Sequence, residues 1–181
     1  ARHYLSPNDM STERDLSGGW YDAGDYNKYT NWTGNYILSM LHAYSENPEV
    51  WTDDYNIPES GNNIPDLLDE ALWGIAHLER LQNEDGSMIS VVSLAGGSPP
   101  SSATGQSLYG SVNSSSTLAS AGVFAFAAKV LGDYGMTELA ERLKIRAEKD
   151  WTWAENNPNV IWKNGFDKSI CKLLILVSII I

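Results

Sequence analysis

The chain has 181 residues, of which 43% are apolar and 19% charged; this balance indicates a folded globular domain, or part of one, and excludes intrinsic disorder. Its 12 Lys and Arg residues against 23 Asp and Glu residues give a formal charge of −11, which disfavours nucleic acid as a partner because phosphate is also negative. The single cysteine, Cys171, excludes an internal disulfide and a cysteine-based zinc site.

The sequence shows no sign of a membrane partner. The apolar run at residues 173–181 is much shorter than the roughly 17 to 25 residues that a spanning helix needs. Residues 1–6 lack the basic-then-apolar order of a signal peptide, so we expect any export signal to have been removed or to lie outside this sequence.

Apolar residues three or four positions apart predict helices. In chain order these cover residues 33–47, 65–81, 117–131 and 137–156. The third is apolar almost all round, so we expect it in an inner layer, whereas the charged face of the fourth predicts an outer position.

The segment between the second and third helices reads differently. Residues 88–94 favour a brief strand, and residues 95–116, rich in Ser, Gly and Pro, favour one long loop. Leu108 and Tyr109 predict that this loop docks on the protein. Since strands and helices do not alternate, we expect an all-α domain built from helical hairpins, without a parallel sheet.

Residues 15–32 concentrate acidic, aromatic and glycine residues without a helical or strand period. Asp22 and Asp25 lie three positions apart, and the small residues between them allow both carboxylates to point into one cavity. Two carboxylates this close repel each other when ionised, which favours a water molecule held between them. A carboxylate that activates water is the base of inverting glycoside hydrolysis, whereas turn or capping roles for both aspartates are the alternative.

Aromatic residues surround these acids. The chain has seven Trp and nine Tyr but three Phe, a choice that favours rings with a polar edge, as in sugar-binding sites. The candidate substrate-binding rings are Trp20, Tyr26, Tyr29 and Tyr109, with Tyr21 and Trp32 also flanking the acids. Packing in a helical core is the alternative for each.

Two segments, GGWYDAGDYNKY and DDYNIPESGNNIPDLLDEALWGIAHLERLQNEDGS, resemble the catalytic domain of glycoside hydrolase family 9, the inverting cellulases. The resemblance continues through SPPSSATGQSLYG and STLASAGVFAFAAKVLG to about Asn157. It implies an (α/α)6 barrel, with Asp25 as the general base and Asp22 helping to hold the nucleophilic water. It also implies a β-1,4-glucan substrate and a secreted, extracellular or periplasmic location.

The resemblance ends at about Trp162, so we expect a partial catalytic domain at residues 1–162 and a non-matching apolar tail at residues 163–181. The family's general acid, a late glutamate, has no counterpart here. We therefore expect an incomplete barrel that self-associates through exposed helix faces, and little or no glycanase activity from the isolated chain.

Two other functions stay open: a carbohydrate-binding remnant without catalysis, and another family activity such as a glucosaminidase or a mixed-linkage glucanase. We expect no cofactor and no metal. His42 and His77 lack a second ligand at metal spacing, and His3 is expected near a frayed end. The acidic residues between Asp53 and Glu70 leave calcium as an alternative that no calcium-loop motif supports.

Overall fold

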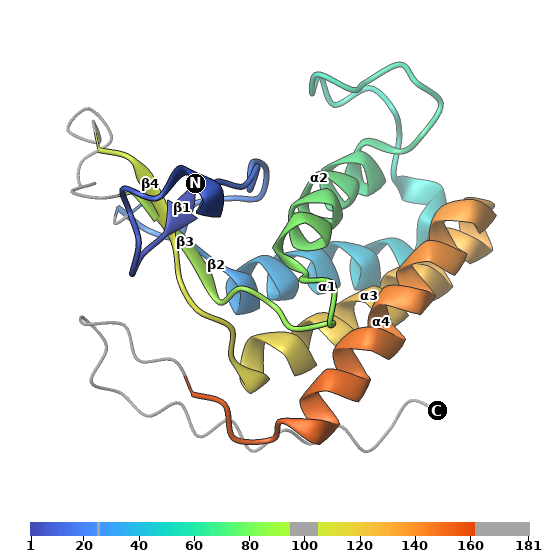
Figure 1. The fold of residues 1–181 in the computed structure, drawn as a ribbon. Coiled ribbons are helices and arrows are strands. Elements are labelled where there is room, and N and C mark those ends of the chain that lie inside the picture. The colour runs from blue at the N-terminus through green and yellow to red at the C-terminus, as the bar shows by residue number, and fades with distance from the viewer. Residues whose placement is uncertain (25, 95–104, 162–181) are drawn as a thin grey trace.

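The computed structural model describes residues 1–24, 26–94 and 105–161. Within these residues the chain forms four α-helices and a small sheet beside the start of the first helix (Figure 1). The helices are α1 (Thr30–Glu46), α2 (Asp66–Leu81), α3 (Ser114–Tyr134) and α4 (Thr137–Asn156), and single turns of 3-10 helix lie at Met10–Thr12 and Pro48–Val50. All four predicted helices are confirmed.

The starts of α1 and α3 each lie three residues earlier than predicted. In α3 the reason is the cap: the side chain of Asn113 accepts a hydrogen bond from the backbone N–H of Ser116 at 2.7 Å, so residues 114–116 form the first turn of the helix. In α1 the chain passes directly from a strand that ends at Tyr29 into the helix.

Helix α1 packs against both α2 and α3, and α3 also packs along α4. The core between them contains fully buried aliphatic and aromatic side chains, including Ile37, Leu41, Leu68 and Phe124. By length and composition alone α3 could cross a membrane, yet half of its most apolar stretch is buried inside the protein, as in the core helix of a globular domain.

Polar contacts tie α4 to α2. Arg142 and Arg146 both donate to Oε1 of Glu79, at 2.9 and 2.8 Å. The side-chain amide of Gln82, one residue beyond α2, donates to the buried carboxylate of Asp150. These contacts fix the α1–α2 pair relative to the α3–α4 pair.

The sheet has four strands in the order β1-β4-β3-β2, namely β1 (Arg2–His3), β4 (Ser107–Tyr109), β3 (Val91–Leu94) and β2 (Asn27–Tyr29). The predicted strand near residues 88–94 is confirmed as β3. The sheet is mixed, since β1 runs parallel to β4 whereas β4, β3 and β2 pair antiparallel, and it is not the parallel sheet that the sequence excluded. The expected single loop at residues 95–116 was wrong, since it contains β4 and the start of α3; residues 95–104 lie outside the described part of the chain.

The N-terminal segment is held in place rather than frayed. His3 pairs with Tyr109 in the sheet, and the centroids of the two rings lie 5.3 Å apart. The amino group of Ala1 donates to the carbonyl oxygen of Arg14 at 2.8 Å. The predicted frayed position of His3 was therefore wrong. Its strand partner, Tyr109, lies more than 100 positions later in the chain, so the local sequence gives no sign of the pairing.

Candidate active site

Asp22 lies on the loop that leads into β2. Its backbone N–H donates to the carbonyl oxygen of Asn27 at 2.7 Å and closes a turn around the predicted catalytic motif, while its side chain is half-buried. Asp25 lies outside the described residues, so the shared cavity of the two carboxylates stays a prediction. Tyr26, the next residue, has φ 58°, a left-handed conformation that is strained for a residue with a Cβ and that clusters at functional sites.

Two tyrosines flank Asp22 on this loop. The rings of Tyr21 and Tyr26 meet edge to face, with centroids 5.0 Å apart, and Tyr21 is 49% exposed. The ammonium group of Lys28 lies 4.7 Å from the centroid of the Tyr21 ring, and burial lowers the pKa of Lys28. All three side chains line a depression of about 320 Å³ beside the loop, which joins aromatic faces to a cation at the predicted active site.

The segment before Asp22 rests on α2. The indole N–H of Trp20 donates to Oε1 of Glu70 at 2.7 Å, and the indole N–H of Trp73 donates to the carbonyl oxygen of Gly19 at 3.3 Å. His77 Nδ1 lies 3.0 Å from the carbonyl oxygen of Ser17. Sequence reasoning did not single out Glu70, Trp73 or His77 as parts of this site. The local signal available was Gly74 on the buried face of α2, where the absence of a side chain lets another segment approach closely.

The predicted sugar-binding rings fall in different surroundings. Trp20 is partly buried and meets the ring of Tyr36 edge to face at 6.0 Å. The hydroxyl of Tyr29, in β2, accepts a hydrogen bond from the side chain of Asn27. Tyr109 is 9% exposed, and its hydroxyl donates to the carbonyl oxygen of Thr12 at 2.9 Å. Their roles in substrate binding stay predictions.

Exposed aromatic residues continue along α1, where Trp32 and Tyr36 lie one turn apart with 50% and 36% of their surfaces exposed. Tyr36 was not predicted as a site residue. Its contact with Trp20 links this surface to the loop that carries Asp22.

One acidic cluster among the described residues has the donor set of a metal site. Carboxylate oxygens of Asp53, Asp66 and Asp69 lie within 4.8 Å of one another, and Asp66 and Asp69 are buried. Asp66 Oδ2 accepts from the backbone N–H of Tyr55 and from the hydroxyl of Ser60, whereas its buried Oδ1 has no partner among the described residues. Carboxylate oxygens suit a hard cation such as Ca²⁺, so the calcium alternative has a defined place in the fold.

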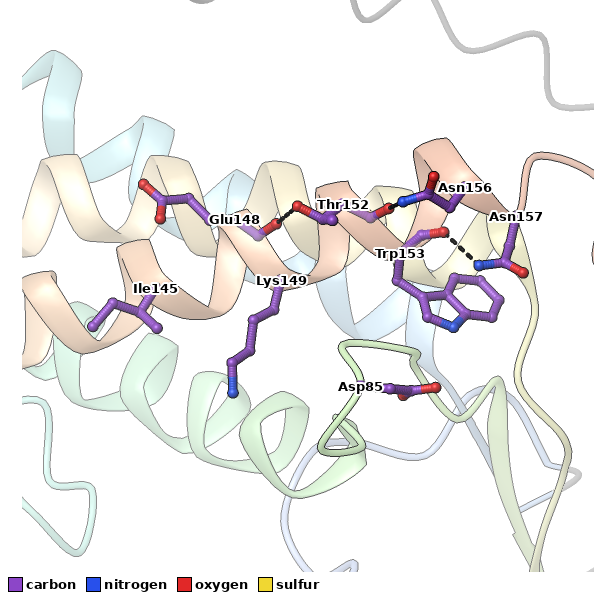
Figure 2. Close-up of a pocket in the computed structure, with 8 residues that line it drawn as sticks. All are labelled: Asp85, Ile145, Glu148, Lys149, Thr152, Trp153, Asn156 and Asn157. Atoms are coloured by element: carbon purple, nitrogen blue, oxygen red, sulfur yellow. Dashed lines mark hydrogen bonds between the residues drawn. The ribbon is translucent and has the colours of Figure 1, made fainter.

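A second depression, of about 390 Å³, lies along α4 (Figure 2). Ile145, Lys149 and Trp153 form one row of the helix beside the turn that carries Asp85. It shares no lining residue with the depression that Tyr21, Tyr26 and Lys28 line, and none of the predicted site residues lines it.

Comparison with solved structures defines the fold class. The chain superposes on a metagenome-derived glycoside hydrolase family 9 endoglucanase with a TM-score of 0.79 and 27% identity, over 91% of this chain and 31% of that one. The matched structures are (α/α)6 barrels, so the four helices correspond to part of such a barrel and the predicted fold class is confirmed.

Sequence comparison then identifies the family. The family described as glycosyl hydrolase family 9 matches residues 2–171, and the chain belongs to it. A cellulose 1,4-beta-cellobiosidase of Acetivibrio thermocellus is 31% identical over 166 residues, covering 81% of this chain and 18% of the relative. A xyloglucan-specific endo-beta-1,4-glucanase of Bacteroides ovatus is 31% identical over 156 residues, covering 82% and 27%. The chain thus spans about a quarter or less of the length of these relatives.

Proposed function

We propose that this chain forms the base side of the active site of an inverting β-1,4-glucan hydrolase, with Asp25 as the general base and Asp22 holding the attacking water. Membership of glycosyl hydrolase family 9 is the observation that carries this proposal. The turn closed between Asp22 and Asn27, the strained backbone of Tyr26 and the exposed ring of Tyr21 support it.

The reaction divides between two carboxyl groups. The base removes a proton from a water that attacks the anomeric carbon, while an acid about 6.5 to 9.5 Å away protonates the leaving oxygen. Asp22 and Asp25 supply the base side in this proposal. The rings of Tyr21, Tyr26 and Trp20 provide apolar faces on which glucosyl units stack, so that the scissile bond lies over the water.

The names of the relatives support cellulose or a related β-glucan as the substrate. One relative is named for cellobiose release from cellulose and another for xyloglucan, and both names specify β-1,4 bonds. Homologous cellulases are typically extracellular. We place this chain outside the cytoplasm as well, because a polymeric glucan does not cross a membrane.

The partial barrel also supports self-association. Trp32, Tyr36 and Trp73 expose large aromatic surface on α1 and α2, and exposed apolar area of this kind favours association. Sedimentation velocity tests this point: a sedimentation coefficient that rises between 5 and 200 μM supports self-association, whereas a constant monomer value rejects it.

Cellotetraose and its α-linked isomer maltotetraose provide the test of the proposed function. Isothermal titration calorimetry is expected to show binding of cellotetraose at least tenfold tighter than binding of maltotetraose. The Asp25→Ala variant is expected to keep this binding and to abolish any reducing-sugar release from a soluble cellulose derivative. Equal affinity for both tetraoses, or no affinity for either, would reject the proposal.

The same experiment tests whether the isolated chain has catalytic activity. Selective binding without reducing-sugar release is the outcome expected of the isolated chain. Turnover by the purified monomer would contradict the expected inactivity and would place a general acid among the residues present. Hydrolysis restricted to an amino-sugar or mixed-linkage substrate would select another family activity.

A further inference from the structure

The backbone before the candidate active site passes directly over one side chain of α2. A Cβ added to Gly19 would lie 2.5 Å from Cδ2 and 2.9 Å from Cγ of His77. A Cβ added to Gly18 would lie 3.2 Å from the Cβ of His77. Both glycines have positive φ, 93° at Gly18 and 64° at Gly19. The imidazole therefore packs directly against the turn, at positions where only glycine fits without a clash or strain.

The hydrogen bond of His77 defines its protonation state. The carbonyl oxygen of Ser17 can only accept, so the Nδ1 atom 3.0 Å away carries the proton and donates it. Nε2 then carries a lone pair, and it is buried without a partner among the described residues. His77 is fully buried, and burial lowers its pKa to about 4, an effect that Lys28 and Arg80 increase. The imidazole is thus neutral at ordinary pH.

Other contacts hold the same turn from outside. The ammonium group of Lys28, in β2, donates to the carbonyl oxygen of Gly18 at 2.6 Å. The indole of Trp73, in α2, donates to the carbonyl oxygen of Gly19. The carbonyl groups of residues 17, 18 and 19 therefore each accept a hydrogen bond from a side chain, and that of Ser17 also accepts one from Arg80 at 3.4 Å. Among these donors only His77 is a fully buried residue.

This turn is three residues from Asp22. We propose that His77 is a positioning residue, whose neutral imidazole supports the turn at residues 17–19 and so fixes the place of Asp22 and the ring of Tyr21. The inference rests on the proposed function, because it assigns His77 to the same site. His77 is fully buried, and in this role it acts through the backbone of residues 17–19 rather than by contact with the substrate.

Two substitutions of His77 test this role. His77→Phe fills the space but removes the N–H donor, whereas His77→Asn keeps a donor near the position of Nδ1. For His77→Phe we expect amide hydrogen exchange at residues 18–22 to accelerate at least tenfold and cellotetraose affinity to fall at least tenfold, with exchange in α3 and α4 unchanged. For His77→Asn both quantities are expected within threefold of wild type.

A measurement on the unsubstituted chain covers the case in which His77→Phe does not fold. Nitrogen-15 NMR is expected to show Nδ1 protonated and Nε2 unprotonated from pH 7 down to about pH 5. A proton on Nε2, or a charged ring at pH 6, would overturn the inference. Wild-type exchange at residues 18–22 in a folded His77→Phe variant would overturn it as well.

The two proposals can fail separately. If the wild type binds no cellotetraose, the proposed function is rejected. The positioning role of His77 in catalysis is then rejected as well, because it depends on that function. If the wild type binds and His77→Phe binds equally well, the function stands and the positioning role is rejected.

Discussion

The indole ring of Trp20 packs directly against Gly74 of α2. A Cβ added to Gly74 would lie only 2.4 Å from Cη2 of the ring. The hydrogen bond from Trp20 to Glu70, one turn earlier in α2, fixes the other edge of the ring. The loop that carries Asp22 is therefore attached to α2 by a ring that fits into the surface of the helix at a residue without a side chain.

We predict that Gly74→Ala destabilises the chain by about 1 to 3 kcal/mol, since the added methyl group forces the indole and Ile37 away from the helix. Urea unfolding measures this change, and Trp fluorescence reports the displaced ring. Gly122→Ala in α3 is the matched control. No described atom lies within 4 Å of its added Cβ, so alanine is expected to stabilise the helix by about 0.5 to 1 kcal/mol. Equal effects at the two positions would contradict the packing argument.

Asp150 predicts a loss of stability as pH rises. Burial raises the pKa of this carboxyl from 3.8 to about 7, so between pH 4 and 7 the folded state binds more protons than the unfolded state. The free energy of unfolding should therefore fall by about 3 to 4 kcal/mol through this group between pH 4 and pH 8. Urea unfolding of Asp150→Asn across this range should lack that decline, and an unchanged decline would assign it to other groups.

For His77 we predict the opposite effect, a free energy of unfolding that rises with pH. Burial lowers its pKa from 6.5 to about 4, so the unfolded state binds more protons between these values, and stability through this group should rise by about 3 kcal/mol as pH increases from 4 to 6.5. The two buried groups therefore offset each other in the wild type over that range. The slope of Asp150→Asn should be positive there and that of a folded His77→Phe negative. Parallel slopes in the two variants would refute both assignments.

The acidic cluster predicts stabilisation by calcium. If Asp53, Asp66 and Asp69 hold the ion, 5 mM CaCl₂ should raise the melting temperature of the wild type by several degrees, because a ligand that binds only the folded state stabilises it. Asp66→Asn should reduce this shift at least twofold. Asp133→Asn, at an exposed carboxylate paired with Lys129, is the control and should retain the full shift. Equal shifts in both variants would place the calcium effect elsewhere.

The helices were predictable because their apolar period extends over four or more turns, whereas the strands contain two to four residues each. A two-residue strand such as β1 has no period to detect, and it forms because Arg2 and His3 meet Leu108 and Tyr109 across the fold. Such pairing depends on tertiary contacts that local sequence does not encode.

The site shows the same division. The motif that contains Asp22 was recognised from neighbouring residues in the sequence, but its supports, Glu70 and His77, come from α2 some 50 to 60 positions later. His77 read as an isolated histidine on a helix, because its partner is a backbone carbonyl group, which every residue possesses. Gly74 on the buried face of α2 was the one local sign that another segment approaches closely.

An NMR titration of the chain with cellotetraose tests the central claim most directly, because amide shifts locate the ligand. We predict that the largest shifts fall on Tyr21, Asp22 and Tyr26, with smaller ones on Tyr36. A saturable titration whose shifts avoid residues 20–29, or cellotetraose that leaves every amide unmoved, would contradict the assignment of this loop to glucan binding and hydrolysis.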